Sequence, residues 1–272
     1  MTQPDQKHPG LRGAGDAHRA ATAPSRSTRY RDWIGKLQRV LPRVKVHIAN
    51  QRAELLSVFQ MLHHRYVCQG YIEPQPSGIL YRPVFGYPTS RTLVAIDQPT
   101  GELMGTLSII SDEASEMPFR SVYTDRLAAW KKSGRRVAEI SSLVIRSSSR
   151  QQAALTLFRL TQFAVQYLLY RHYDDMIFLV HPRHKPYYER CFEVEAIRDC
   201  RPHPLMRGSP ACACRVNLHG QQRLNMHSLY LGEKIPMRQL AQPPITAADH
   251  LWFCHQAGVA DPGPTTSANR VA

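Results

Sequence analysis

Arg135-Arg-Val-Ala-Glu-Ile-Ser-Ser-Leu-Val-Ile145 is the stretch that decides the fold. Its apolar and β-branched residues contain no glycine or proline and lie between a basic turn and a Ser/Arg turn, so they predict a buried β-strand. Alternation with a period of two divides such a strand into two faces. One face carries the odd-numbered residues Val137, Glu139, Ser141, Leu143 and Ile145.

Glu139 is the unusual residue of this strand, because it is a carboxylate among apolar neighbours. A buried carboxylate is costly unless it is paired with a cation or keeps its proton. Two interpretations follow. Glu139 forms a structural ion pair, with Arg136 or with an arginine from a loop, or it serves chemistry.

The residues after this strand predict a helix and then a second strand. Ser147-Ser-Ser-Arg-Gln151 supplies a helix start, and Ala153 to Tyr170 is apolar almost all round, which is typical of a buried helix. Met176-Ile-Phe-Leu-Val180 follows as a short apolar strand. A helical crossover between two buried strands predicts that they are parallel.

A family resemblance rests on this order, on the Glu-x-Ser-Ser strand and on the loop His181-Pro-Arg-His-Lys-Pro-Tyr-Tyr188. Over roughly residues 44–218 the chain resembles the GNAT acyltransferase superfamily, and within it the long-chain N-acyl amino acid synthases, which are related to the acyl-homoserine-lactone synthases. The resemblance implies an α/β (α+β) fold with helices on both faces of a mixed central sheet. That sheet would be splayed between the neighbouring parallel strands 136–146 and 176–181.

Composition limits the partners and the setting. The formal charge of +14 favours acidic partners, and no apolar run reaches the roughly 18 residues that a membrane span needs. We expect a cytoplasmic protein, with peripheral contact at the inner membrane surface as an addition. The six cysteines contain no Cys-x-x-Cys pair, so reduced thiols are expected and no zinc site is indicated.

Four regions follow from patterning and from the extent of the resemblance. Residues 1–28 predict a disordered basic arm and 29–43 an amphipathic helix, while 44–218 form the acyltransferase domain and 219–272 a partly disordered extension. The apolar face of 29–41 fits either packing on the domain or contact with a membrane surface. Nucleic acid is not expected as a partner, because the basic residues are scattered and no binding motif is present.

The loop Ser148-Ser-Arg-Gln-Gln-Ala-Ala154 indicates which acyl donor the protein uses. Family relatives that use coenzyme A have a glycine-rich loop here, and its backbone N–H groups hold the diphosphate. Both glycines are absent. The resemblance independently implies acyl carrier protein, whose phosphopantetheine thioester brings a single phosphodiester; acyl-coenzyme A is the alternative. No bound cofactor is expected.

The candidate catalytic residues are Glu139 as base, with His184 as the alternative base, and Tyr188 or Tyr187 as donor to the departing thiolate. Arg82, within the aromatic-rich segment 70–90, is the candidate clamp for the acceptor carboxylate, with Arg183 in reserve. The remaining candidates for substrate binding are Ser141, Ser142, Arg65 and Tyr81.

The predicted function is transfer of a long-chain acyl group to the α-amino group of an amino acid. An acyl-homoserine-lactone synthase and a coenzyme A-dependent N-acyltransferase are the alternatives. Ser142 argues against the lactone synthase, because those enzymes have arginine after the Glu-x-Ser of this strand. A membrane-associated scaffold with an inactive GNAT fold is the alternative that is not an enzyme.

Overall fold

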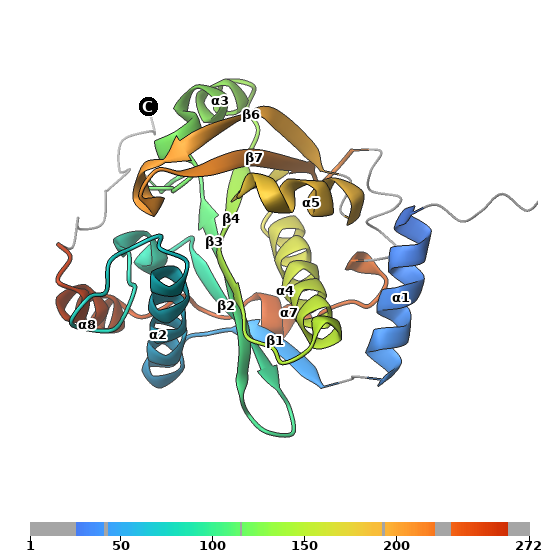
Figure 1. The fold of residues 1–272 in the computed structure, drawn as a ribbon, viewed down its shortest axis with the longest axis horizontal. Helices are drawn as coiled ribbons and strands as arrows, with labels where there is room; N and C mark the ends of the chain where they lie inside the picture. Colours follow the sequence, from blue (N-terminus) through green and yellow to red (C-terminus); the bar gives the residue numbers. More distant parts are fainter. Residues whose placement is uncertain (1–25, 41–42, 115, 192–193, 221–229, 261–272) are drawn as a thin grey trace, which may run out of the picture.

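The computed structural model describes residues 26–40, 43–114, 116–191, 194–220 and 230–260. Within these residues a mixed seven-stranded sheet has the order β1-β2-β3-β4-β5-β7-β6 (Figure 1). Only its central pair, β4 and β5, is parallel. The strands are β1 (Val44–Ile48), β2 (Arg91–Asp97), β3 (Leu103–Ser111), β4 (Val137–Ile145), β5 (Asp175–Val180), β6 (Glu195–His203) and β7 (Ser209–Asn217).

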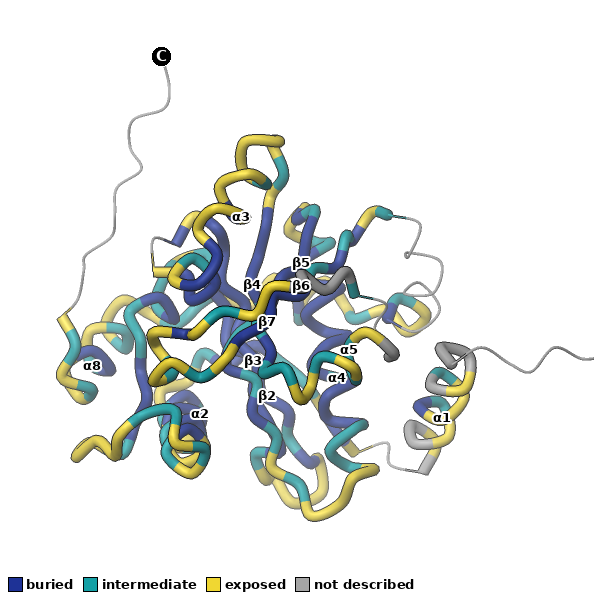
Figure 2. Tube along the Cα trace, turned by 45° about the horizontal axis from the view of Figure 1, so that its top comes forward, coloured by how far each residue is buried: buried dark blue, intermediate teal, exposed yellow. Residues whose placement is uncertain are grey.

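Helices cover both faces of the sheet, as predicted. Those on one face are α1 (Arg26–Val40), α4 (Arg150–Tyr170), α5 (Lys185–Cys191) and α7 (Met237–Leu240), and those on the other are α2 (Arg52–Cys68), α3 (Arg120–Lys132) and α8 (Ala247–Ala257). Three short 3-10 turns are η1 (Pro83–Gly86), η2 (Pro182–His184) and η3 (Pro204–Met206). The buried positions concentrate along the central strands and α4 (Figure 2).

Local sequence explains several of these elements. Ser149 caps α4 by accepting a hydrogen bond from the Gln152 N–H at 3.1 Å. A glycine in the middle of a strand, such as Gly105 in β3, predicts a bulge or a close backbone approach, and the structure confirms this. A Cβ there would lie 2.9 Å from the carbonyl oxygen of Val144 and 3.1 Å from Thr156 Cγ2. Only glycine allows β3, β4 and α4 to pack this closely.

The cysteine prediction was wrong for one pair, because the structure joins Cys200 to Cys212 in a disulfide. These residues are register partners on β6 and β7, with their Cα atoms 4.2 Å apart. In the sequence, the neighbours Cys212 and Cys214 share one face of a strand, which is a poor geometry for a mutual disulfide, and Cys200 gives no local sign of pairing. Pairing between strands is a non-local property that cysteine spacing does not reveal.

The N-terminal helix α1 begins at Arg26, inside the arm predicted for residues 1–28; the rest of that arm lies outside the described residues. Ile34 is buried against the core, and α1 contacts α4 and α5, which agrees with the domain-packing interpretation. Trp33 remains 37% exposed. No helix within the described ranges is long and apolar enough to cross a membrane. Membrane-surface contact through 29–41 stays a prediction.

Candidate active site

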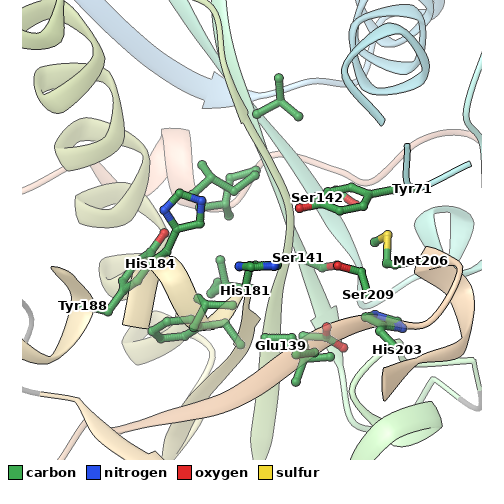
Figure 3. A pocket seen from close by; sticks show the side chains of 18 of the residues that line it. Tyr71, Glu139, Ser141, Ser142, His181, His184, Tyr188, His203, Met206 and Ser209 are labelled. Carbon is green, nitrogen blue, oxygen red and sulfur yellow. The ribbon is translucent and has the colours of Figure 1, made fainter. Parts of the chain in front are cut away.

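A cavity of about 290 Å³ lies where β4 and β5 separate. The two strands pair only from Val137 opposite Asp175 to Ile140 opposite Phe178. Beyond Ile140, β4 continues without a partner on its β5 side, so the predicted splay is confirmed. The cavity spans both faces of the sheet. In Figure 3, His184 and Tyr188 lie on one side of β4, and Glu139 and His203 lie on the other.

A β-bulge in β4 shapes the cavity wall. Ser141 is opposite Ser108 but Val144 is opposite Thr106, so β4 carries an extra residue, and Ser142 has a left-handed φ of 53°. Such a conformation costs a non-glycine residue about 1–2 kcal/mol. Beyond the bulge the side-chain alternation is reversed. The prediction that Leu143 and Ile145 lie on the same face of β4 as Glu139 is therefore wrong. Leu143 and Ile145 pack in the cluster on the α4 face, away from the side of Glu139.

An ion cluster holds the opposite ends of these strands together. Asp175 is fully buried, and Arg135 Nη2 donates to its Oδ1 at 2.8 Å. Arg215 from β7 donates to the same carboxylate from Nε at 3.0 Å. Two bidentate arginines therefore tie β4, β5 and β7 at the end away from the cavity. The strands diverge only at their other ends.

Glu139 is 1% exposed and lies in the cavity wall. The main-chain N–H of Phe119 donates to its Oε2 at 2.8 Å. Burial raises the pKa of Glu139 to about 8, against the smaller lowering effects of this hydrogen bond and of the Arg82 charge. No basic residue in the described part of the chain forms an ion pair with it. Arg136, the suggested partner, instead donates to the carbonyl of Arg171 at 2.8 Å.

His184 and Arg183 line the cavity mouth on η2. Arg183 Nε donates to His184 Nε2 at 3.0 Å, and Arg183 Nη2 donates to Gln69 Oε1 at 2.9 Å. Burial, together with the charges of Arg183 and His181, lowers the pKa of His184. The imidazole is therefore neutral, but its Nε2 lone pair already accepts a hydrogen bond from Arg183.

The two candidate tyrosines separate clearly. Tyr188 lines the cavity and packs against Phe178, with ring centroids 5.2 Å apart. Burial raises the pKa of Tyr188, so the phenol keeps its proton at neutral pH. Tyr187 packs against the α4-side core and is not among the residues lining the cavity.

The candidate binding residues divide in the same way. Ser141, Ser142 and Arg65 line the cavity. Tyr81 does not, since its ring is buried between α2 and α8 and its hydroxyl lies 2.5 Å from His250 Nδ1. Arg82 is also outside the lining, although its charge lowers the pKa of Glu139.

Sequence reasoning missed the contribution of the β6–β7 hairpin. His203, Met206 and Ser209 line the cavity on the Glu139 side (Figure 3). The sequence predicts the first strand of this hairpin from Val194 to Asp199, but β6 continues to His203. The β-strand pattern is interrupted by Pro202, which is tolerated because β6 is the edge strand of the sheet.

A second groove lies beside the cavity, and Arg65 and Val144 line both. The groove is also lined by His64 of α2 and by Arg146 and Ser147 after β4. A basic groove therefore borders the cavity near the loop that leads into α4.

A mixed sheet that opens between two parallel strands, with helices on both faces, is the architecture of GNAT-like acyltransferases. The family model of the N-acyl amino acid synthase FeeM matches residues 57–217, and the chain belongs to this family. It is thus an N-acyltransferase related in fold to the acyl-homoserine-lactone synthases. No curated protein matches the sequence.

Solved structures share the fold. FeeM, an N-acyl amino acid synthase from uncultured soil microbes, is 21% identical with a TM-score of 0.57, over 67% of this chain and 94% of that one. TofI, in a ternary complex with an inhibitor and MTA, is 17% identical with a TM-score of 0.52, over 68% and 96%. MesI, a CoA-dependent acyl-homoserine lactone synthase, is 12% identical with a TM-score of 0.50, over 71% and 97%.

Proposed function

We propose that this N-acyltransferase moves a long-chain fatty acyl group from the phosphopantetheine thioester of acyl carrier protein to the α-amino group of an amino acid. The observation that carries the proposal is Glu139. It is a buried carboxylate without an ion-pair partner in the described chain, and it lies where strands β4 and β5 open. Its pKa is about 8. Family membership supports the same product class.

The pKa of Glu139 is close to that of the amino group from which it would take a proton. An α-ammonium group has a pKa of about 8, and only its neutral amine attacks a thioester. A base with a similar pKa takes this proton at almost no free-energy cost. Glu139 is the proposed base, and His184 ranks second because Arg183 occupies its Nε2 lone pair.

The donor would lie along the unpaired edge of β4. Backbone groups of residues 141–145 face the gap without a β5 partner, and amide groups of pantetheine can extend them as an extra strand. Near the bulge at Ser141 and Ser142, backbone N–H groups would stabilise the oxyanion that forms when the amine attacks.

Attack forms the C–N bond, and collapse of the intermediate restores the carbonyl and breaks the C–S bond. The ammonium loses two protons in all: Glu139 passes the first to solvent before attack and takes the second from the nitrogen after it, while the sulfur leaves as a thiolate. A thiol has a pKa of about 8.5, well below the raised pKa of Tyr188. We therefore propose that Tyr188 donates a hydrogen bond to the thiolate and keeps its proton.

The acyl chain would follow the α4 side of the cavity. The residues lining it there are predominantly apolar: Leu107, Ile140, Leu143, Leu157, Ala164, Met176 and Phe178. Burial of each methylene group contributes about 0.8 kcal/mol, so such a wall favours long chains.

Carrier protein is favoured over coenzyme A by the loop before α4. No glycine occurs from Ser147 to Ala154, so a diphosphate lacks the close backbone approach that it needs. A single phosphodiester could instead contact the basic groove at Arg65 and Arg146. MesI and its CoA-dependent relatives show that both donors must be tested in this fold.

The experiment offers palmitoyl-carrier protein and palmitoyl-coenzyme A at matched concentrations with all twenty amino acids, and detects amides by mass spectrometry. We expect a long-chain N-acyl amino acid, formed preferentially from the carrier protein. Equal use of both donors would remove the carrier-protein preference. No amide with any acceptor, from protein shown to be folded, would overturn the proposed function and favour a scaffold.

The same assay decides the lactone alternative. TofI was solved with MTA, and its fold resembles this one. A homoserine lactone that appears only when S-adenosylmethionine is added would establish that alternative. We expect none, since Ser142 replaces the arginine of those synthases in the resemblance described above.

A further inference from the structure

His203 is a buried histidine to which neither the sequence analysis nor the mechanism above gives a task. It ends β6, pairs with Ser209 of β7, and its carbonyl accepts a hydrogen bond from Gly208 N–H at 3.0 Å. These contacts fix its backbone at the tip of the hairpin. The side chain is 5% exposed and lines the same cavity as Glu139 (Figure 3).

The ring has an unsatisfied nitrogen. Nδ1 is enclosed and has no hydrogen-bond partner among the described residues. Buried N–H groups without an acceptor are rarer than acceptors without a donor, so the ring hydrogen belongs on Nε2. This tautomer leaves Nε2–H as the polar group that the ring can offer to a molecule in the cavity.

The electrostatic environment of His203 favours an anionic ligand. Burial, followed by the Arg82 charge, lowers the pKa of His203 to about 4, so the ring is neutral at working pH. Arg82 itself is not among the cavity-lining residues, but its positive charge acts on both His203 and Glu139. A neutral N–H donor in a positive electrostatic potential favours a carboxylate, and hydrogen bonds to a charged acceptor are the stronger ones.

We propose that His203 binds the carboxylate of the acceptor amino acid by donating a hydrogen bond from Nε2. The inference rests on the proposed function and assigns its specificity. The carboxylate would lie at His203 and the amino group at Glu139, two residues that line one side of the cavity. An amine that lacks a carboxylate would leave this donor without a partner.

The test compares phenylalanine with phenethylamine, which lacks the carboxylate, as acceptors for a palmitoyl thioester. In wild-type protein we expect kcat/KM to favour phenylalanine at least tenfold. His203→Phe should reduce this ratio about tenfold by weakening use of phenylalanine while sparing the amine, as expected for loss of a hydrogen bond to a charged group. His203→Asn, which keeps an N–H donor, should restore part of the ratio.

His255→Asn is the control, since this exposed histidine lies on α8 away from the cavity lining. An unchanged ratio in folded His203→Phe, or an equal loss with both acceptors, would overturn the inference and leave His203 with a structural role. Absence of any amide from wild-type protein is a different result, because it rejects the proposed function itself. If His203→Phe does not fold, His203→Leu, which also lacks the N–H donor, takes its place: a reduced ratio supports donation by the ring, and an unchanged ratio overturns it.

Discussion

The main-chain N–H of Phe119 donates a 2.8 Å hydrogen bond to Glu139 Oε2, and this is the carboxylate's polar contact with the described protein. Phe119 directly precedes α3, so the start of a helix on one face of the sheet orients a side chain from the middle of β4. A single neutral donor holds the carboxylate in place without stabilising its charge as a cation would. The pKa of Glu139 therefore stays high, and the group can exchange its proton near neutral pH.

Glu139→Gln should abolish most of the activity without unfolding the protein. Glutamine keeps the shape and can still accept the Phe119 hydrogen bond, but it cannot take a proton. We expect turnover to fall between about 10²- and 10⁴-fold. Retention of more than roughly a tenth of the turnover would reject Glu139 as base, and His184→Gln would then be the variant to measure.

The same substitution should change how stability depends on pH. The pKa of Glu139 is raised in the folded state, so its contribution to stability is full below about pH 4.5 and is lost as pH rises towards 8. Glu139→Gln removes this titration. Urea unfolding at pH 5, 7 and 9 should therefore show the variant gaining stability relative to wild type as pH rises. A constant difference would mean that the pKa is not raised.

Asp175→Asn should destabilise the whole sheet. The substitution leaves the partly buried Arg135 and Arg215 against a neutral group, and breaking an ion cluster around a buried carboxylate typically costs about 3–5 kcal/mol. Chemical denaturation measures the loss. Asp125→Asn, which breaks the exposed pair with Arg201, is the control and should change stability little. Equal effects of the two substitutions would show that the ion cluster at Asp175 does not hold β4, β5 and β7 together.

Arg146→Ala should weaken use of the carrier-protein donor. Arg146 is exposed at the end of the basic groove, and losing one such contact with a phosphate should lower kcat/KM about two- to fivefold. An acyl-N-acetylcysteamine thioester, which has no phosphate, should be used as well as before. Arg238→Ala on α7 is the matched control. A similar loss with both thioesters would show that Arg146 does not contact the phosphate.

His250→Ala should disturb the acceptor site from outside the region that the family model matches. His250 on α8 lies against the Tyr81 hydroxyl at 2.5 Å and against Gly86, and these residues flank Arg82. We expect a higher KM for the amino acid and an unchanged KM for the thioester, because Arg82 loses its support. Leu251→Ala, at an exposed position of the same helix, should leave both constants unchanged. Equal rises in both KM values would show general destabilisation.

Most strands and helices were predictable because their signals are local. Apolar alternation in Val44-Lys-Val-His-Ile48 predicts a strand, which β1 confirms with the same bounds, and the helical spacing of Leu55, Val58, Phe59 and Leu62 predicts the helix that is observed as α2. The two strands of the β6–β7 hairpin are predicted as Val194 to Asp199 and Cys212 to Leu218, too short only at the ends next to the turn, where Pro202 interrupts the pattern. Its tip then brought His203 to the cavity, which no local pattern indicates.

The sequence by itself determined that Glu139 would be buried, that two parallel strands would flank the α4 crossover and that the loop at 181–188 would follow them. These depend on composition and period along one segment of chain. Tertiary structure alone decided that Glu139 has no ion pair with any described residue, that Ser142 adopts a left-handed conformation, that Tyr81 is a core residue and that His203 lies in the cavity. Each of these depends on which distant segments meet, and pairing energies between segments far apart in sequence leave no periodic trace in either one.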